Sequence, residues 1–199
     1  MNTVSSKKRQ YELKARAEAQ QATHARIAAA AASLHEEVGI GRTTVADIAR
    51  RAGVQRLTVY NHFADLDALL PACSAHYLAQ HPRPDLAPVL ALPDPDERLR
   101  AALTALYGWY RECAPMQRRV QGERATVPEL DAWLKRSSDV ALAELADGLA
   151  SGLDGPHVRA LVALSLDFWT WQRLDREGLD DAAAAAAMAD MVRGATHAP

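Results

Sequence analysis

Apolar residues recur with the period of an α-helix along almost the whole chain. Residues 11–38 consist largely of strong helix formers. An apolar side emerges there at Ile27, Ala30, Ala31, Leu34 and Val38. Residues before position 23 have almost no apolar face. The pattern therefore predicts a helix whose first part is either a solvated extension or a disordered arm.

A short second helix and a third one follow closely. Thr44 can cap the second helix, and Asp47 three residues later completes a short capping box. Gly53 stands where a helix end favours the left-handed conformation. The expected buried side of the second helix is Val45, Ile48, Ala49 and Ala52. Because Val54, Val59 and Phe63 are the next core-type residues, a third helix must begin almost at once. The pattern predicts a helix-turn-helix.

The remainder of the chain is also helical in pattern. Asp65 or Asp67 can open a fourth helix that runs to about His81, with Pro71 able to bend it. Residues 82–95 hold five prolines and predict a loop. Later helices are expected over residues 96–113, 115–124, 128–153, 156–177 and 180–196. We therefore expect an all-α fold of about nine helices without strands.

The charge distribution differs between the two parts of the chain. Residues 1–63 carry 10 Lys and Arg against 5 Asp and Glu, whereas residues 64–199 carry 13 against 20. A basic head on an acidic body suggests that the head binds a polyanion. The alternative is a chance distribution together with a solvated basic arm.

Several protein classes lack support in the sequence. Cys73 and Cys113 are far apart, and there is neither a CxxC motif nor a cluster of histidines, which argues against a disulfide scaffold and a zinc site. We expect no metal and no cofactor. Neither a secretory signal nor an uncharged apolar run of about 18 residues is present, so we expect a cytoplasmic protein. The catalytic and phosphate-binding motifs of common enzymes are missing as well, and we expect no enzyme.

Residues 43–70 carry the most specific motif, with the sequence TTVADIARRAGVQRLTVYNHFADLDALL. This stretch resembles the signature of the tetracycline-repressor (TetR) family. The matching features are the Thr-Thr start, Ile48-Ala49, Ala52-Gly53-Val54, Thr58, Tyr60, His62-Phe63 and Leu69-Leu70. The resemblance implies a DNA-binding head, a helical body that binds a small ligand, and a homodimer formed through the last two helices. It divides the chain into a basic arm or helix extension (1–22), a helix-turn-helix domain (23–64) and a regulatory and dimerisation domain (65–199).

The third helix carries the candidate DNA contacts. A recognition helix keeps a thin core side and presents polar groups to the major groove, where Arg pairs with guanine and Gln with adenine. Gln55, Arg56, Thr58, Asn61 and His62 are expected to face outward. The resemblance implies base contacts from Arg56, Leu57 and Tyr60, and phosphate contacts from Thr44, Thr58, Asn61 and His62. The alternative is a short solvated surface helix.

The chain departs from the family pattern at two positions. Leu57 replaces a small residue or proline, and this leucine could touch a thymine methyl or pack on the head. Leu66 stands where the family usually has a phosphate-binding lysine. A basic arm, expected to be mobile without DNA, could compensate by reaching the minor groove or could remain a solvated charge run. Its basic residues are Lys7, Lys8, Arg9, Lys14 and Arg16.

The body carries the candidate ligand and dimer residues. By resemblance, the helices that enclose a ligand bear Tyr77, Tyr107, Tyr110, Met116 and Trp133. Such a lining suits an apolar or aromatic small molecule, although an ordinary core is the alternative. Dimer-seam candidates are Leu161, Val162, Ser165, Trp169, Gln172, Ala184, Ala187, Met188, Met191, Val192 and Ala195, which could instead be internal core. We expect a ligand-responsive repressor, a transcriptional regulator released from its operator by a small molecule. The alternative is a helical ligand-binding protein or enzyme whose helix-turn-helix contacts protein.

Overall fold

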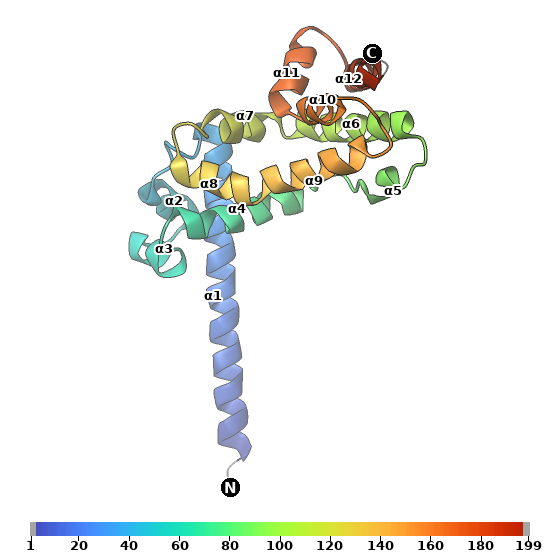
Figure 1. The fold of residues 1–199 in the computed structure, drawn as a ribbon. Coiled ribbons are helices and arrows are strands. Elements are labelled where there is room, and N and C mark those ends of the chain that lie inside the picture. Colours follow the sequence, from blue (N-terminus) through green and yellow to red (C-terminus); the bar gives the residue numbers. More distant parts are fainter. Residues whose placement is uncertain (1–2, 197–199) are drawn as a thin grey trace. The chain divides into compact units, whose positions relative to one another are not determined.

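The computed structural model describes residues 3–196 of the chain and the side chains of residues 10–196. This part is α-helical without strands, which confirms the expected fold class (Figure 1). The chain forms two compact units, Met1–Gln80 and His81–Pro199. The division drawn from the sequence lay after residue 64 instead, because it followed the end of the expected third helix. The fourth helix lies in the first unit because it packs on the first helix.

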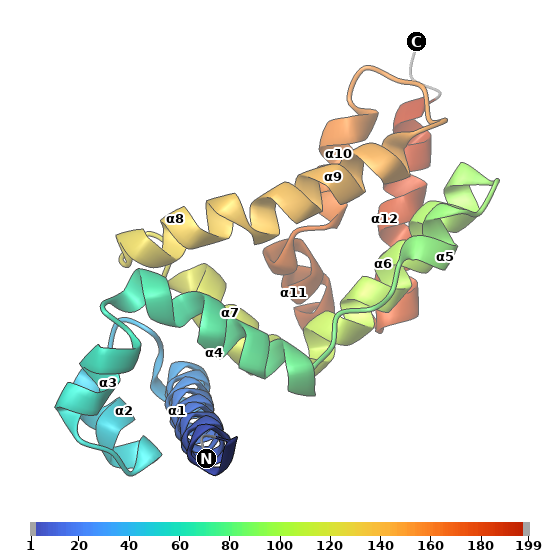
Figure 2. The same cartoon turned by 90° about the horizontal axis from the view of Figure 1, so that it is seen from below.

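The first unit is a small helical head. Its helices are α1 (Thr3–Val38), α2 (Val45–Ala52), α3 (Arg56–His62) and α4 (Leu66–Gln80). Helix α1 packs against α2 and α4, and α2 packs against α3 (Figures 1 and 2). The core residues between these helices are Ile27, Ala31, Leu34, Ile48, Ala52, Val59, Phe63, Leu69 and Leu70. Val38, which was expected on the buried side of α1, is 37% exposed.

Helix α1 continues far beyond the head that it supports. It has 36 residues and begins at Thr3. Residues 10–22 are exposed, and burial begins only near Thr23 and Ile27. In Figure 1 this half of α1 runs clear of α2, α3 and α4. Of the two alternatives for the basic arm, the structure has the helical extension; the side chains of Lys7, Lys8 and Arg9 lie outside the described side chains.

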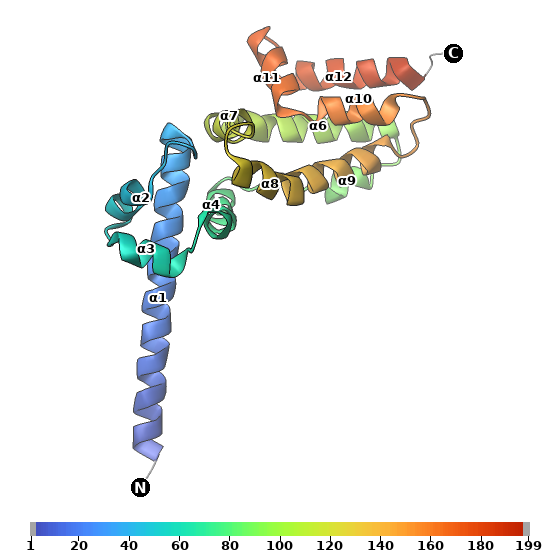
Figure 3. The same cartoon turned by 60° about the vertical axis from the view of Figure 1, so that its left-hand side comes forward.

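The second unit is a bundle in which α12 runs along α6 and α10, and α9 packs on α10 and α6 (Figure 3). Its helices are α5 (Ala87–Leu90), α6 (Pro95–Glu112), α7 (Ala114–Gly122), α8 (Pro128–Arg136), α9 (Ser138–Ala150), α10 (Val158–Ser165), α11 (Phe168–Arg176) and α12 (Asp181–Thr196). The short α5 lies within the proline-rich stretch that was expected to be a loop.

Two of the expected long helices are each broken in two, and these breaks together with α5 explain why the described residues hold twelve helices rather than about nine. The helix expected over 128–153 breaks at Ser137, whose hydroxyl donates to the Trp133 carbonyl at 2.8 Å. The helix expected over 156–177 breaks before Asp167. The Asp167 carboxylate accepts from the amides of Trp169 and Thr170, at 2.8 and 3.0 Å, and so caps the start of α11. Apolar periodicity continues across both breaks, so periodicity alone could not locate them.

Candidate nucleic-acid interface

Helix α2 begins and ends at the two caps that the sequence predicted. The Thr44 hydroxyl accepts from the Asp47 amide, and the Asp47 carboxylate accepts from the Thr44 amide, which completes the capping box. Gly53 has φ +65° and closes α2. The Gly53 amide donates to the Arg50 carbonyl and the Val54 amide to the Ala49 carbonyl, the Schellman pattern. Helix α3 can therefore start at Arg56, three residues after Gly53.

A clamp between α1 and α2 holds the helix-turn-helix on the long helix. The Arg51 guanidinium donates to both carboxylate oxygens of Glu37, at 2.7 and 2.8 Å, and to the Ser33 hydroxyl at 2.8 Å. Hydrogen bonds from Arg51 and Ser33 lower the pKa of Glu37 to about 2. The Glu37 hydrogen bond in turn raises the pKa of Arg51. The sequence analysis missed this clamp, because partners on different helices have no fixed spacing.

Helix α3 has one buried side and one exposed side. Val59 is 2% exposed and packs in the core, whereas Leu57 is 66% and Tyr60 54% exposed. At about 100° per residue, Leu57 and Tyr60 lie nearest the middle of the exposed side, flanked by Arg56 and Asn61. Gln55, Arg56 and Asn61 are also exposed. The helix thus places two apolar groups between polar ones on a surface without protein cover.

The candidate phosphate-binding residues have different surroundings. Asn61 is exposed, whereas Thr58 and His62 are half-buried. The His62 ring lies 6.0 Å from that of His24 on α1, and the His24 ring packs on Phe63 at 4.4 Å. Thr44 is exposed, but its hydroxyl already donates to Asp47. Hydrogen bonds from Thr44 and Arg50 lower the pKa of Asp47, which keeps this carboxylate charged as a cap.

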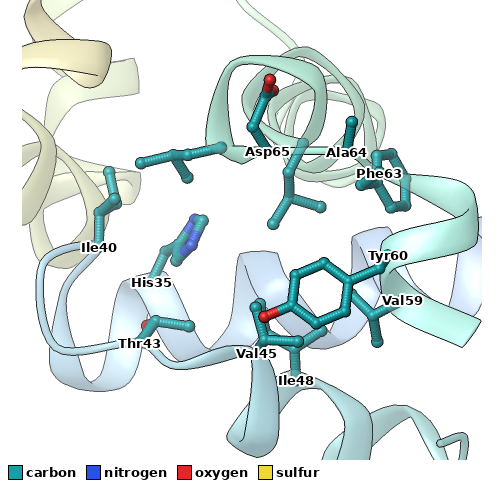
Figure 4. A pocket seen from close by; sticks show the side chains of 12 residues that line it. His35, Ile40, Thr43, Val45, Ile48, Val59, Tyr60, Phe63, Ala64 and Asp65 are labelled. Carbon is teal, nitrogen blue, oxygen red and sulfur yellow. The ribbon is translucent and has the colours of Figure 1, made fainter. Parts of the chain in front are cut away.

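A small, partly open cavity of about 160 Å³ lies in the head, where α1, α2, α3 and the start of α4 meet (Figure 4). Tyr60 is one of the residues that line it, and Figure 4 shows its ring beside Val45 and Val59. His35 lies deeper, 3% exposed, with its Nδ1 atom 3.6 Å from the Sγ atom of Cys73. Burial raises the pKa of the Cys73 thiol to about 12, so this cysteine stays protonated.

The five candidate ligand residues are spread over several helices. Tyr107 and Tyr110 lie together on α6, both buried, with ring centres 6.5 Å apart. Met116 lies on α7, Trp133 on α8, and Tyr77 on α4 in the first unit, where its hydroxyl faces Glu36 at 3.4 Å. Tyr110 belongs to an aromatic cluster with Trp109, Phe168 and Trp171.

The hydroxyls of Tyr107 and Tyr110 brace the break between α10 and α11. They donate to the carbonyls of Ser165 and Leu166, at 2.7 and 2.8 Å. These carbonyls lie at the end of α10, where a helix leaves its last acceptors unpaired. Burial raises the pKa of both tyrosines, so they remain donors. The sequence analysis assigned these rings to a ligand and had no signal for this bracing role.

We expect Tyr107→Phe and Tyr110→Phe each to lower the free energy of unfolding by about 1–3 kcal/mol, because each leaves a buried carbonyl without its donor. Urea unfolding of the full-length protein measures the effect. Tyr11→Phe is the matched control, since Tyr11 is 74% exposed on α1 and its loss should change little. Unchanged stability of both core variants would show that these carbonyls do not need the tyrosines.

In the described part of the chain, His, Cys, Asp and Glu side chains form no group of three or more that could hold a metal ion. No helix in the same part is both long and apolar enough to cross a bilayer.

Comparison with known proteins identifies the head. Residues 27–73 match the family described as "Bacterial regulatory proteins, tetR family". They run from the packed part of α1 to the first half of α4. An uncharacterised HTH-type transcriptional regulator of Mycobacterium tuberculosis (strain ATCC 25618 / H37Rv) is 42% identical over 57 residues, 29% of this chain. That match spans only 30% of the relative's length.

A longer match and two solved structures extend the likeness into the body. The HTH-type transcriptional regulator BetI of Burkholderia thailandensis is 32% identical over 148 residues, 64% of this chain and 76% of BetI. A transcriptional regulator from Rhodococcus sp. Rha1 has a TM-score of 0.64 at 24% identity, over 87% of this chain and 98% of that one. RolR, crystallised with resorcinol, has a TM-score of 0.51 at 22% identity, over 92% and 97%. The two structures show a shared fold, and the match to BetI covers most of that regulator: the chain belongs to the tetR family of bacterial regulatory proteins.

Proposed function

We propose that this protein is a sequence-specific DNA-binding transcriptional regulator that inserts α3 into the major groove. The exposed side of α3 is the observation that carries the proposal, because Arg56, Leu57, Tyr60 and Asn61 are all exposed there. The groove is about 12 Å wide and accepts a helix of about 10–12 Å. The excess of basic residues in positions 1–63 favours a polyanionic partner.

In this proposal the residues at the start of α3 and along it have two different roles. Gln55, Arg56, Leu57 and Tyr60 would face base edges, because they are exposed at the start and the middle of α3. Thr58, Asn61 and His62 would contact phosphates beside the groove. Thr44 would orient the N-terminus of α2 toward a phosphate, since its own hydroxyl is engaged with Asp47.

We further propose a homodimer formed through the last helices of the second unit. Burial within one chain divides the candidate seam residues into two groups. Val162, Ser165, Gln172, Ala184 and Val192 are at most 1% exposed and belong to the chain's own core. Trp169 on α11 is 42% exposed, and Leu164 on α10 is 48% exposed. Together with the half-buried Met188 and Met191 of α12, these residues are the ones available for a partner.

The regulator would act as a repressor that a small molecule releases from its operator. RolR, which shares the fold at 22% identity, was crystallised with resorcinol. An apolar or aromatic effector suits the aromatic residues of the second unit. Such a molecule shifts the protein away from its DNA-binding form only by its differential affinity for the two forms.

Selection of bound sequences from a random DNA pool tests the proposed function. We expect a near-palindromic site with half-site centres about one helical turn, or a multiple of it, apart. Sedimentation should show a dimer at micromolar concentration. A pool without enrichment after repeated rounds would contradict the DNA-binding role. Enriched sites without dyad symmetry, or a monomer in sedimentation, would contradict the homodimer alone.

A further inference from the structure

Leu57 is a large apolar residue in the middle of the surface that would meet DNA. It is 66% exposed, more than any other apolar residue of α3. Val59, only two residues away, is 2% exposed, because the helix turns these side chains about 160° apart. Two explanations for a leucine here are packing on the head and contact with a base. A side chain that is 66% exposed does not pack on the head, so contact with a base is the explanation that remains.

The neighbouring Tyr60 is partly packed within the head, unlike Leu57. Tyr60 lines the cavity inside the head, so part of its ring has a packing role within the unit. Leu57 does not line that cavity, and α1, α2 and α4 leave most of its side chain uncovered. An apolar side chain gains free energy when it leaves water, but it can neither donate nor accept a hydrogen bond. Its contribution to recognition therefore depends on an apolar group of the partner.

The major groove offers one such group on its base edges. Thymine carries a methyl group at C5, whereas the other bases present hydrogen-bond donors and acceptors there. A cytosine methylated at C5 places the same group at the same position. We propose, on the basis of the proposed function, that Leu57 is a specificity-determining residue that reads the C5-methyl group of a pyrimidine in each half-site. Apolar contact with this methyl is the means of discrimination.

Deoxyuridine provides the test, because it keeps the hydrogen-bonding edge of thymine and lacks only the methyl. In the operator obtained by selection, each thymine pair related by the dyad is replaced by deoxyuridine in turn, and dissociation constants are measured with the full-length protein. We expect one position at which the affinity falls about 3- to 5-fold per half-site, the value of one buried methyl. In Leu57→Ala this difference between thymine and deoxyuridine should disappear.

Two controls and a second experiment with methylated cytosine make the assignment to Leu57 specific. Val140→Ala removes a comparably exposed apolar residue (49%) from α9 and should retain the deoxyuridine effect. The salt dependence should be equal for thymine and deoxyuridine duplexes, since no charge changes. With cytosine at the sensitive position, C5 methylation should raise the affinity of the wild-type protein but not of Leu57→Ala. A gain from thymine without a gain from 5-methylcytosine would assign thymine alone as the partner of Leu57.

The outcomes that overturn the inference are separate from those that overturn the proposed function. If an operator is selected but no thymine is sensitive to loss of its methyl, Leu57 does not read a methyl and the regulator role stands. A deoxyuridine effect that persists undiminished in Leu57→Ala assigns the methyl to another residue and also overturns the inference. Failure to select any operator overturns the DNA-binding role, and the inference with it.

Discussion

Replacing Arg56 with alanine is expected to weaken binding to the best operator by about 5- to 150-fold per half-site, equivalent to about 1–3 kcal/mol. The reason is the fork of donors that a guanidinium directs at guanine O6 and N7, which no other base presents. Arg56 is exposed at the first turn of α3, at the end of the recognition helix that approaches base edges. The Arg56→Ala protein should also discriminate less between bases at one position of each half-site. Binding to the operator and to its single-base variants measures both effects.

Two further variants separate base recognition from charge. Arg56→Lys keeps the positive charge but loses the planar fork, so it should retain the salt dependence and still relax the base preference. His62→Ala should instead weaken binding to all sequences evenly, as expected for a phosphate contact. An Arg56→Ala protein with unchanged base preference would show that Arg56 contacts phosphate or solvent, contrary to the assignment.

Deleting residues 1–18 is expected to leave folding and dimerisation intact and to weaken operator binding by about 10- to 100-fold at low salt. The deleted stretch holds five basic residues against two acidic ones, and its described side chains, residues 10–18, are all exposed. Near DNA these charges release counterions, and each neutralised phosphate contributes about −0.9 to the slope of log affinity against log salt. Measurements at several salt concentrations, with full-length and shortened protein, give both quantities.

The helical form of the arm changes what it can contact. A helix of about 10–12 Å is too wide for a minor groove of about 6 Å. The arm would therefore lie along phosphates, and loss of a preference for flanking A·T pairs on deletion would indicate that it unwinds on DNA. A full-length protein with Lys14→Gln and Arg16→Gln is the matched control, since it keeps the helix and removes charge. Equal slopes for all three proteins would show that the arm is a solvated tail.

The local structure of the head was predictable because its signals are local. The capping box of Thr44 and Asp47 and the left-handed Gly53 each depend on residues a few positions apart. They therefore determine where α2 begins and ends regardless of the rest of the fold. The motif around them was also enough to predict the family. The break at Asp167 had a comparable local signal, a capping carboxylate, but continuous apolar periodicity concealed it.

The choice between core and surface could not be made from the sequence, because an apolar side chain satisfies either position in a helical pattern. Tertiary packing turned Leu57 outward and Val59 inward. It also placed Val162 in the chain's own core while leaving Trp169 42% exposed. The roles of Tyr107 and Tyr110 also depend on packing, because their hydroxyls reach the carbonyls of Ser165 and Leu166 only in the folded second unit. The sequence by itself determined the helices of the head and the family; only packing between helices decided which side chains are buried in the core and which remain exposed.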